Sequence, residues 1–407
     1  MKVCDVVMNS IWYDPRVRKQ IVEYLKNEID LSCVGYECPR YDEEKIKQMP
    51  CKVNVVKRDE RYLGKQRSII RKFTREKIKN KAVCEAIVAE KPDVIHANDL
   101  DALIPAMMAQ KVLKCKVIYD SHEVYTENNF LQNKRLYAAF LRRKERKLCK
   151  KIDLMVCVSN AAADYFTKML KIYRPMVVTN CTLKEEQICL VGKNEGFEVL
   201  NHGQYYAGRG YDVMVEALPL LKDYPEVKLA LRGFGALEQS LRERAKELGD
   251  ENIIFYPKVL VQELIPEASK SMVGVAITEG ICKNFELSVS NKLFEYAAVG
   301  LPVIMSDIPE HRYLNEKYNF GIIIEDNKPQ TFAKAVIKLY TDKEFYNKCA
   351  ENAKVLSDEI NWENEFNKLL QFEKALLGVR EWLKTNLSGG QFALICWFSS
   401  MHYMASF

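Results

Sequence analysis

Lys292 and Glu295 stand three residues apart in the segment 284–307, NFELSVSNKLFEYAAVGLPVIMSD. A lysine at the start of a helix suits a phosphate group, because the N–H groups and dipole of the helix also attract anions there. A carboxylate one turn later suits the paired hydroxyls of a ribose. An ordinary surface ion pair has the same spacing, so the segment by itself leaves both interpretations open.

The neighbouring residues predict the helix that holds this pair. Ser290 is typical of an N-cap, Gly300 is typical of the position after a helix end, and Pro302 prevents continuation. We therefore predict a short helix that begins at Asn291 and runs over residues 291–299.

The rest of the 407-residue chain alternates short apolar runs with helical stretches, which predicts parallel sheets. The pattern restarts near residue 196, so we expect an α/β protein with two doubly wound, Rossmann-like domains facing each other across a cleft. Ligands of such sheets bind beyond the carboxyl ends of the strands. The expected strands are 3–8, 53–56, 93–96, 116–119 and 154–159, then 197–201, 227–231, 252–256, 273–277, 302–306 and 320–324.

This pattern divides the chain into four segments: two domains, a helical segment and a tail. The helices after the second domain either close that domain or brace the first one. The tail begins with LSGGQ, the signature peptide of ABC-transporter ATPases, but the chain lacks the GxxxxGK[ST] loop of such enzymes. An added strand, a surface anchor and a chance stretch remain alternatives for the tail. The predicted segments are domains 1–188 and 189–360, helices 361–386 and a tail 387–407.

His122 follows the predicted strand 116–119, between Asp120 and Glu123. A single histidine is more often structural than catalytic, but this one should hang from a strand end into the cleft, which favours a functional role. His96, at the end of the preceding strand, is better explained as a structural neighbour. In DPRV (14–17), a cap followed by proline starts a helix, and Arg16 is placed to meet an anionic acceptor.

Several segments together resemble glycosyltransferase family 4, the retaining transferases of GT-B fold that use nucleotide-activated sugars. Each segment is weak evidence alone, but their shared order over about residues 1–375 is specific. They are DPRVRKQIVEYL (14–25), KPDVIHANDLDALIPA (91–106), VIYDSHEVYTE (117–127), DLMVCVSNAAADYF (153–166), HGQYYAGRGYDVMVEAL (202–218), LALRGFGALEQSL (229–241) and NKLFEYAAVGLPVIMSD (291–307).

The resemblance implies a GT-B fold, with the acceptor on the N-terminal domain and the donor on the C-terminal one. It matches Glu295 to the glutamate that binds the donor ribose, and Arg209 to the basic residue that contacts the diphosphate. Lys292 adds to that charge, with Gly203 and Asn291 beside it. It also places His122 beside the transferred sugar.

Two positions depart from the family pattern. Many relatives have an arginine directly after the glycine that matches Gly203, whereas this chain has Gln204; Arg232 is a candidate replacement. The family's first glutamate lies eight residues before the second, and here Leu287 holds that place. Glu286 is one residue away, so we name it as a catalytic candidate on the assumption that a loop tolerates the shift.

Asp99 opens a DLD pattern, which in the other major glycosyltransferase fold holds a divalent cation. The two-domain pattern argues against that fold, so we predict no metal site and place Asp99 on the acceptor side with Arg16. No cofactor is expected, because the nucleotide sugar is a substrate. The 13 cysteines show no metal-ligand spacing, which favours a reduced, cytoplasmic protein.

The charge is unevenly distributed. Residues 1–190 hold 37 Lys/Arg and 25 Asp/Glu, whereas the remainder holds 24 and 30. Basic runs at 64–81 and 142–151 favour an anionic membrane surface as partner, on the inner face of the membrane. Nucleic acid is disfavoured, because no binding motif accompanies the charge. No apolar run is long enough to cross a bilayer.

These observations predict a metal-independent, retaining glycosyltransferase of the hexosyltransferase type. It would move a sugar to a saccharide or lipid-linked acceptor in surface-polysaccharide biosynthesis. Two alternatives stay open: a sugar-nucleotide epimerase of the same fold, and a non-catalytic partner subunit, which Gln204 and Leu287 support.

Overall fold

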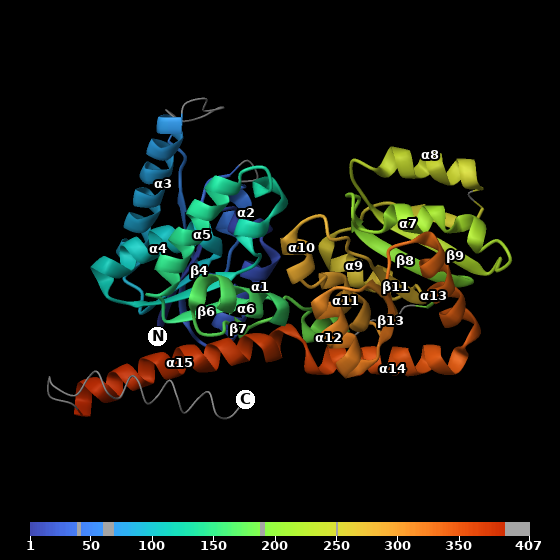
Figure 1. Cartoon of the computed structure of the whole chain (residues 1–407). Coiled ribbons are helices and arrows are strands. Elements are labelled where there is room, and N and C mark those ends of the chain that lie inside the picture. Colours follow the sequence, from blue (N-terminus) through green and yellow to red (C-terminus); the bar gives the residue numbers. More distant parts are fainter. Residues whose placement is uncertain (39–41, 60–68, 188–191, 250, 387–407) are drawn as a thin grey trace. The chain divides into compact units, whose positions relative to one another are not determined.

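The computed structural model describes residues 1–38, 42–59, 69–187, 192–249 and 251–386. Within these ranges, two parallel sheets alternate with helices (Figure 1), and the predicted α/β architecture is confirmed. The tail 387–407, whose role was left open, lies outside the described residues.

The first sheet has the strand order β3-β2-β1-β4-β5-β6-β7 among the described residues. Strands β2 and β7 were not predicted. Serine, cysteine and glycine interrupt the apolar run of β2, and β7 is only two residues long. The strands are β1 (Lys2–Val7), β2 (Asp30–Tyr36), β3 (Lys52–Val56), β4 (Val94–Asn98), β5 (Lys116–Ser121), β6 (Leu154–Cys157) and β7 (Met176–Val177). The helices between them are α1 (Pro15–Lys26), α2 (Glu43–Lys47), α3 (Ile69–Glu90), α4 (Asp99–Leu113), α5 (Arg135–Cys149) and α6 (Asn160–Phe166).

The second sheet has the order β10-β9-β8-β11-β12-β13 in the described part of the chain. Its strands are β8 (Phe197–Gln204), β9 (Val227–Phe234), β10 (Ile253–Tyr256), β11 (Val273–Ala276), β12 (Val303–Ser306) and β13 (Gly321–Ile324). Its helices are α7 (Tyr211–Glu216), α8 (Glu238–Leu248), α9 (Val261–Ala268), α10 (Lys283–Leu287), α11 (Asn291–Ala297), α12 (Pro309–Tyr318), α13 (Pro329–Thr341) and α14 (Lys343–Glu359), followed by α15 (Trp362–Asn386). Strand β8 pairs with β9 on one side and with β11 on the other. The chain therefore leaves β8 on one side and later returns on its other side, and this switch point opens a crevice at the carboxyl end of β8.

Buried strand residues form the core of this second sheet. Val199 and Leu231 on β8 and β9 pack with Val275 on β11 and with Met214 of α7. These positions come from the apolar runs of the sequence, and their burial fixes which strand ends meet at the crevice.

The described chain forms two compact units. Among the described residues, the smaller unit contains those of 1–97, 101–118 and 366–386, and the larger unit contains those of 98–100 and 119–365. This division differs from the predicted boundary at residue 188. The chain nevertheless passes from the first sheet to the second between β7 and β8, and these two strands lie on either side of residue 188 in the sequence.

Helix α15 contributes to the core of the smaller unit. The Tyr24 hydroxyl of α1 donates to Glu373 Oε1 at 2.6 Å, and its ring packs edge-on against Phe366 at 4.9 Å between centroids. The same hydroxyl lies 2.8 Å from Nδ1 of His96, which is fully buried. His96 is therefore part of the interior packing, and burial raises the pKa of Glu373 to about 7.

Candidate functional site

A pocket of about 410 Å³ lies within the larger unit, at the carboxyl end of β8 and the start of α11. Six of the residues named from the sequence line it: His122, Gly203, Arg209, Asn291, Lys292 and Glu295. The other lining residues are Ser121, Glu123, Val124, Val158, Ala162, Phe166, His202, Leu264, Asn284, Phe285, Leu287, Ser288, Val289 and Ser290.

Helix α11 begins at Asn291 as predicted, but it ends at Ala297 rather than at residue 299. Ser290 occupies the N-cap position, yet its side chain makes no capping hydrogen bond in the described structure. Its backbone N–H instead donates to Nε2 of His311 at 3.4 Å, while His311 Nδ1 lies 3.1 Å from the Ser306 carbonyl oxygen. Burial lowers the pKa of His311 to about 4, so a neutral imidazole holds the start of the helix.

Lys292 lies partly buried in the pocket wall. Its Nζ donates to Asn201 Oδ1 at 2.6 Å and lies 5.1 Å from the centre of the Tyr211 ring. Burial lowers the pKa of Lys292 to about 7; the positive charge of Arg209 acts in the same direction and Glu295 opposes it. An anion in the pocket would raise this pKa again, because it would stabilise the ammonium form.

Asn201 connects both cations of the pocket. Its Oδ1 accepts from Lys292, and its Nδ2 donates to the Arg209 carbonyl oxygen at 3.0 Å. The Arg209 guanidinium carbon lies 4.5 Å from the centre of the Phe285 ring, and burial lowers the pKa of Arg209. Two positive groups are thus held in one desolvated wall, an arrangement that suits a doubly charged anion.

Glu295 is held by strand β8. Its Oε2 lies 2.7 Å from Nε2 of His202, whose ring is buried against the Tyr296 ring at 4.6 Å between centroids. The His202 backbone N–H donates to the Tyr296 hydroxyl at 3.1 Å, and that hydroxyl donates to the Leu200 carbonyl oxygen. The carboxylate therefore has a fixed position one turn from Lys292.

Gly203 lines the pocket at the carboxyl end of β8. Its φ of +124° favours glycine, and a Cβ there would lie 3.3 Å from the Tyr211 hydroxyl and 3.6 Å from Lys292 Cε. A larger residue would strain the backbone and narrow the space next to the lysine.

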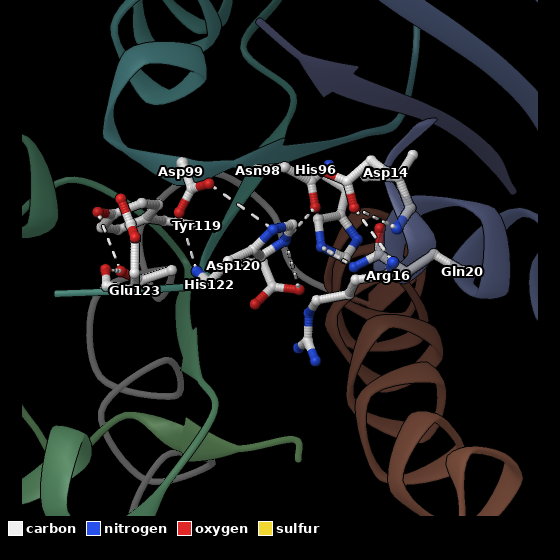
Figure 2. Close-up of polar contacts among 12 residues, drawn as sticks. Asp14, Arg16, Gln20, His96, Asn98, Asp99, Tyr119, Asp120, His122 and Glu123 are labelled. Carbon is white, nitrogen blue, oxygen red and sulfur yellow. Dashed lines mark hydrogen bonds and ion pairs between the residues drawn. The ribbon is translucent and has the colours of Figure 1, made fainter. Parts of the chain in front are cut away.

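His122 follows the end of β5 and lines the pocket. Figure 2 shows the polar contacts of this histidine. Its Nε2 lies 2.9 Å from Asn98 Oδ1 and 3.8 Å from a carboxylate oxygen of the buried Asp120. Asp99 Oδ1 accepts from the His122 backbone N–H at 2.9 Å, and its Oδ2 lies 3.6 Å from Nδ1. Two carboxylates and an amide thus orient one imidazole at the pocket wall.

Two family models match consecutive parts of the chain. Residues 19–182 match the model described as Glycosyltransferase Family 4, and residues 196–342 match the one described as Glycosyl transferases group 1. The chain is a family 4-like glycosyltransferase.

Individual relatives agree with this assignment. An uncharacterized glycosyltransferase of Haemophilus influenzae is 24% identical over 190 residues, which cover 46% of this glycosyltransferase and only about half (50%) of the relative. The sucrose-phosphate synthase of Thermosynechococcus elongatus superposes with a TM-score of 0.74 at 13% identity, covering 93% of this chain and 100% of the other.

Anabaena HepE in complex with UDP and glucose superposes with a TM-score of 0.68 at 14% identity, covering 92% of this chain and 99% of the other. At such identities the similarity establishes the fold, and the predicted GT-B architecture is confirmed.

Glu286 does not line the pocket of the glycosyltransferase. Its carboxylate pairs with Lys283 Nζ at 2.6 Å and its side chain is 40% exposed, whereas Leu287 lies in the pocket wall. The prediction for Glu286 assumed a loop, but the segment is helix α10. One residue along a helix turns a side chain by about 100°, so Asn284 and Leu287, three apart, share the pocket face and Glu286 faces elsewhere.

Arg232 also lies outside the pocket. Its Nη2 pairs with Glu267 Oε2 at 2.9 Å, and its guanidinium carbon lies 4.4 Å from the centre of the Tyr256 ring. Arg232 as a replacement for the phosphate contact expected at Gln204 therefore stays a prediction; Gln204 is itself exposed and outside the lining residues. Arg209 and Lys292 are the basic residues that the structure brings to the pocket.

The two acceptor-side candidates have different surroundings. Asp99 orients the His122 backbone and is not among the lining residues. Arg16 is buried in the first turn of α1, in the smaller unit, where Asp14 caps the helix by accepting from the Arg16 and Val17 N–H groups. The role of Arg16 toward an acceptor stays a prediction.

Asn201 and His202 were missed by sequence reasoning. Both precede Gly203 at the carboxyl end of a strand, and two polar residues at such a strand end are the available signal. In the described ranges, no group of three or more His, Cys, Asp or Glu residues is arranged to hold a metal ion. No described helix is long and apolar enough to cross a membrane.

Proposed function

We propose that this glycosyltransferase is a retaining, metal-independent enzyme of the hexosyltransferase type that uses a nucleotide-sugar donor. The observation that carries the proposal is the joint presence of Arg209, Lys292, Glu295 and His122 around one pocket. The UDP in the HepE structure, a GT-B neighbour, supports a nucleotide sugar as donor here.

The chemistry follows from the charges of the pocket. The bond between the sugar and the diphosphate breaks with its electron pair going to the phosphate oxygen. The acceptor hydroxyl forms the new bond to the same carbon through its oxygen and gives its proton to the leaving diphosphate. Arg209 and Lys292 would stabilise the charge that develops on the leaving diphosphate, the role that a divalent cation has in other transferases. Glu295 would accept hydrogen bonds from the ribose, and His122 would contact the sugar.

We place the acceptor among saccharides or lipid-linked saccharides of surface-polysaccharide biosynthesis, at the cytoplasmic face of a membrane. The support is the excess of positive charge in residues 1–190. The role of His122, whose imidazole is oriented by Asn98, Asp99 and Asp120, is independent of this choice of acceptor.

The test is to incubate the protein with a panel of nucleotide sugars, with and without membrane extract and with a chelator. The expected result is nucleotide release that depends on the acceptor and survives chelation, with product NMR showing the anomeric configuration of the donor. Loss of turnover on chelation would contradict metal independence, and an inverted anomer would contradict retention.

One observation favours a second candidate, a non-catalytic partner subunit. The carboxylate expected beside the sugar is replaced in the pocket wall by Leu287. Donor binding by calorimetry without turnover on any acceptor would support this second candidate. Epimerised free donor would contradict both candidates.

A further inference from the structure

Helix α5, which is labelled in Figure 1, runs from Arg135 to Cys149. It carries an exposed stripe with two chemical halves. Leu136 and Phe140 form its first half and are 89% and 52% exposed, and Arg143 and Lys147 form its second half and are also exposed. These four residues are spaced by 4, 3 and 4 positions, so they follow one face of the helix. We call them the α5 stripe.

The opposite face of α5 packs into the larger unit. Its buried residues are Ala138, Leu141, Glu145 and Cys149. Arg142 pairs with Glu127, and Arg146 donates to the Met169 carbonyl oxygen, so these two arginines are held against the protein beside the stripe. The stripe is therefore the outward face of a helix that is already fixed in the fold.

Apolar and basic residues around the stripe extend both halves. Phe130 and Tyr137 are 49% and 48% exposed, and the Tyr137 ring stacks on the Phe140 ring at 6.4 Å between centroids. Residues 129–151 contain nine Lys/Arg and a single acid, Glu145, which is buried. The outward charge here is uniformly positive.

We propose that the α5 stripe is a docking surface for an anionic lipid bilayer. Leu136 and Phe140 would enter the boundary of the acyl chains, while Arg143 and Lys147 would contact anionic headgroups. The proposal rests on the proposed function, in which the acceptor is lipid-linked, and names the surface through which the enzyme meets that acceptor's membrane.

Charge argues against a second copy of the chain as the occupant. In a symmetric dimer through this face, parallel helices would bring the two basic halves together, where like charges repel. Antiparallel helices would instead set each basic half against the partner's apolar half, which would bury charge without a partner. Nucleic acid also fits less well, because a phosphate backbone offers no partner for a leucine as exposed as Leu136.

The test is co-sedimentation of the full chain with phosphatidylcholine vesicles that contain phosphatidylglycerol, compared with phosphatidylcholine alone. We expect binding to the anionic vesicles only, and weaker binding at high salt. Replacing the apolar pair, Leu136→Glu with Phe140→Glu, should weaken binding about ten-fold or more. Arg143→Glu with Lys147→Glu should weaken it by a similar factor.

The matched control is Val261→Glu on α9, where the valine is also exposed (73%) but the helix, VQELIPEA, contains no Lys or Arg. This variant should bind like wild type, and thermal unfolding followed by circular dichroism should show that all variants fold. Equal binding by wild type and both stripe variants would overturn the proposal. The proposal would also be overturned if the wild type did not bind vesicles but bound RNA, or self-associated in gel filtration, and the stripe variants lost that binding or self-association.

Vesicle binding is measured without donor or acceptor. Binding without any turnover would leave the docking surface standing and contradict only the proposed transfer. Turnover on a detergent-solubilised acceptor without vesicle binding would contradict the docking surface alone.

Discussion

Helices α10 and α11 follow each other in the chain, yet their carboxylates end in different surroundings. Glu295 of α11 lies in the pocket because His202 of β8 contacts it, whereas Glu286 of α10 pairs with Lys283 at the surface. The lysines of the two helices differ in the same way: Asn201 holds Lys292 in the pocket wall, whereas Lys283 is exposed. A charged residue becomes part of this site when strand β8 supplies a polar partner for it.

Removing the pocket cations should have the largest effect. We expect Lys292→Met or Arg209→Met to lower kcat/KM about 10²- to 10³-fold, because each removes a positive group from the leaving diphosphate. Lys283→Met on α10 is the matched control and should stay near wild type. Steady-state kinetics of nucleotide release would measure kcat/KM for these variants. Equal decreases in kcat/KM for Lys283→Met and Lys292→Met would contradict the contrast between α10 and α11.

The two carboxylates should differ next. Glu295→Ala should raise the Kd of the donor about 10- to 100-fold, since it removes charged hydrogen bonds to the ribose. Glu286→Ala should change the Kd by less than about two-fold, as expected for an exposed ion pair. Isothermal titration calorimetry with the donor measures both. A larger loss from Glu286→Ala would mean that α10 turns toward the donor on binding.

The shifted pKa of Lys292 predicts a pH dependence. The free protein loses the Lys292 proton as pH rises through about 7, and a bound diphosphate favours the protonated form. The Kd of the donor should therefore rise with pH above about 7, by at most about ten-fold per pH unit. Lys292→Met should remove this dependence, and an unchanged slope in that variant would assign it to another group.

The same shift affects folding stability in the opposite direction. The pKa of Lys292 is lower in the folded chain than its ordinary value of 10.5, so the unfolded chain binds more protons between about 7 and 10.5. The free energy of unfolding of wild type should therefore rise relative to that of Lys292→Met across this range. Urea titrations of both proteins at several pH values would measure the difference, and parallel curves would contradict the lowered pKa.

Arg232 should show the smallest effect on the donor. Arg232→Met should leave the donor Kd within about two-fold of wild type and lower the free energy of unfolding by about 1–2 kcal/mol, because the partly buried ion pair with Glu267 and the contact with the Tyr256 ring are lost. Glu267 keeps Lys270 as a partner. Calorimetry and urea unfolding separate the two effects. A large rise in Kd would show that the arginine reaches the phosphates after all.

Much of the fold was predictable because apolar runs mark buried strands. Five of the seven described strands of the first sheet and all six of the second follow such runs. Strand β2 was missed because Ser32 and Gly35 dilute its pattern, and β7 was missed because it is only two residues long. The site was predictable where the residues lie close together, as in helix α11. The loop assumed around Glu286 is instead the short helix α10, which sequence reasoning did not predict. Asn201 and His202 were missed because their partners lie about 90 residues away.

The sequence by itself determined the alternation of strands and helices, the family resemblance, and the spacing that puts Lys292 and Glu295 one turn apart. These are local properties, set by side-chain periodicity and backbone preference. Only the tertiary structure decided which charges meet in the pocket, because that depends on which strand end lies beside which helix. The same long-range contacts bury Lys292 and lower its pKa, and they leave Glu286 and Arg232 to pair elsewhere.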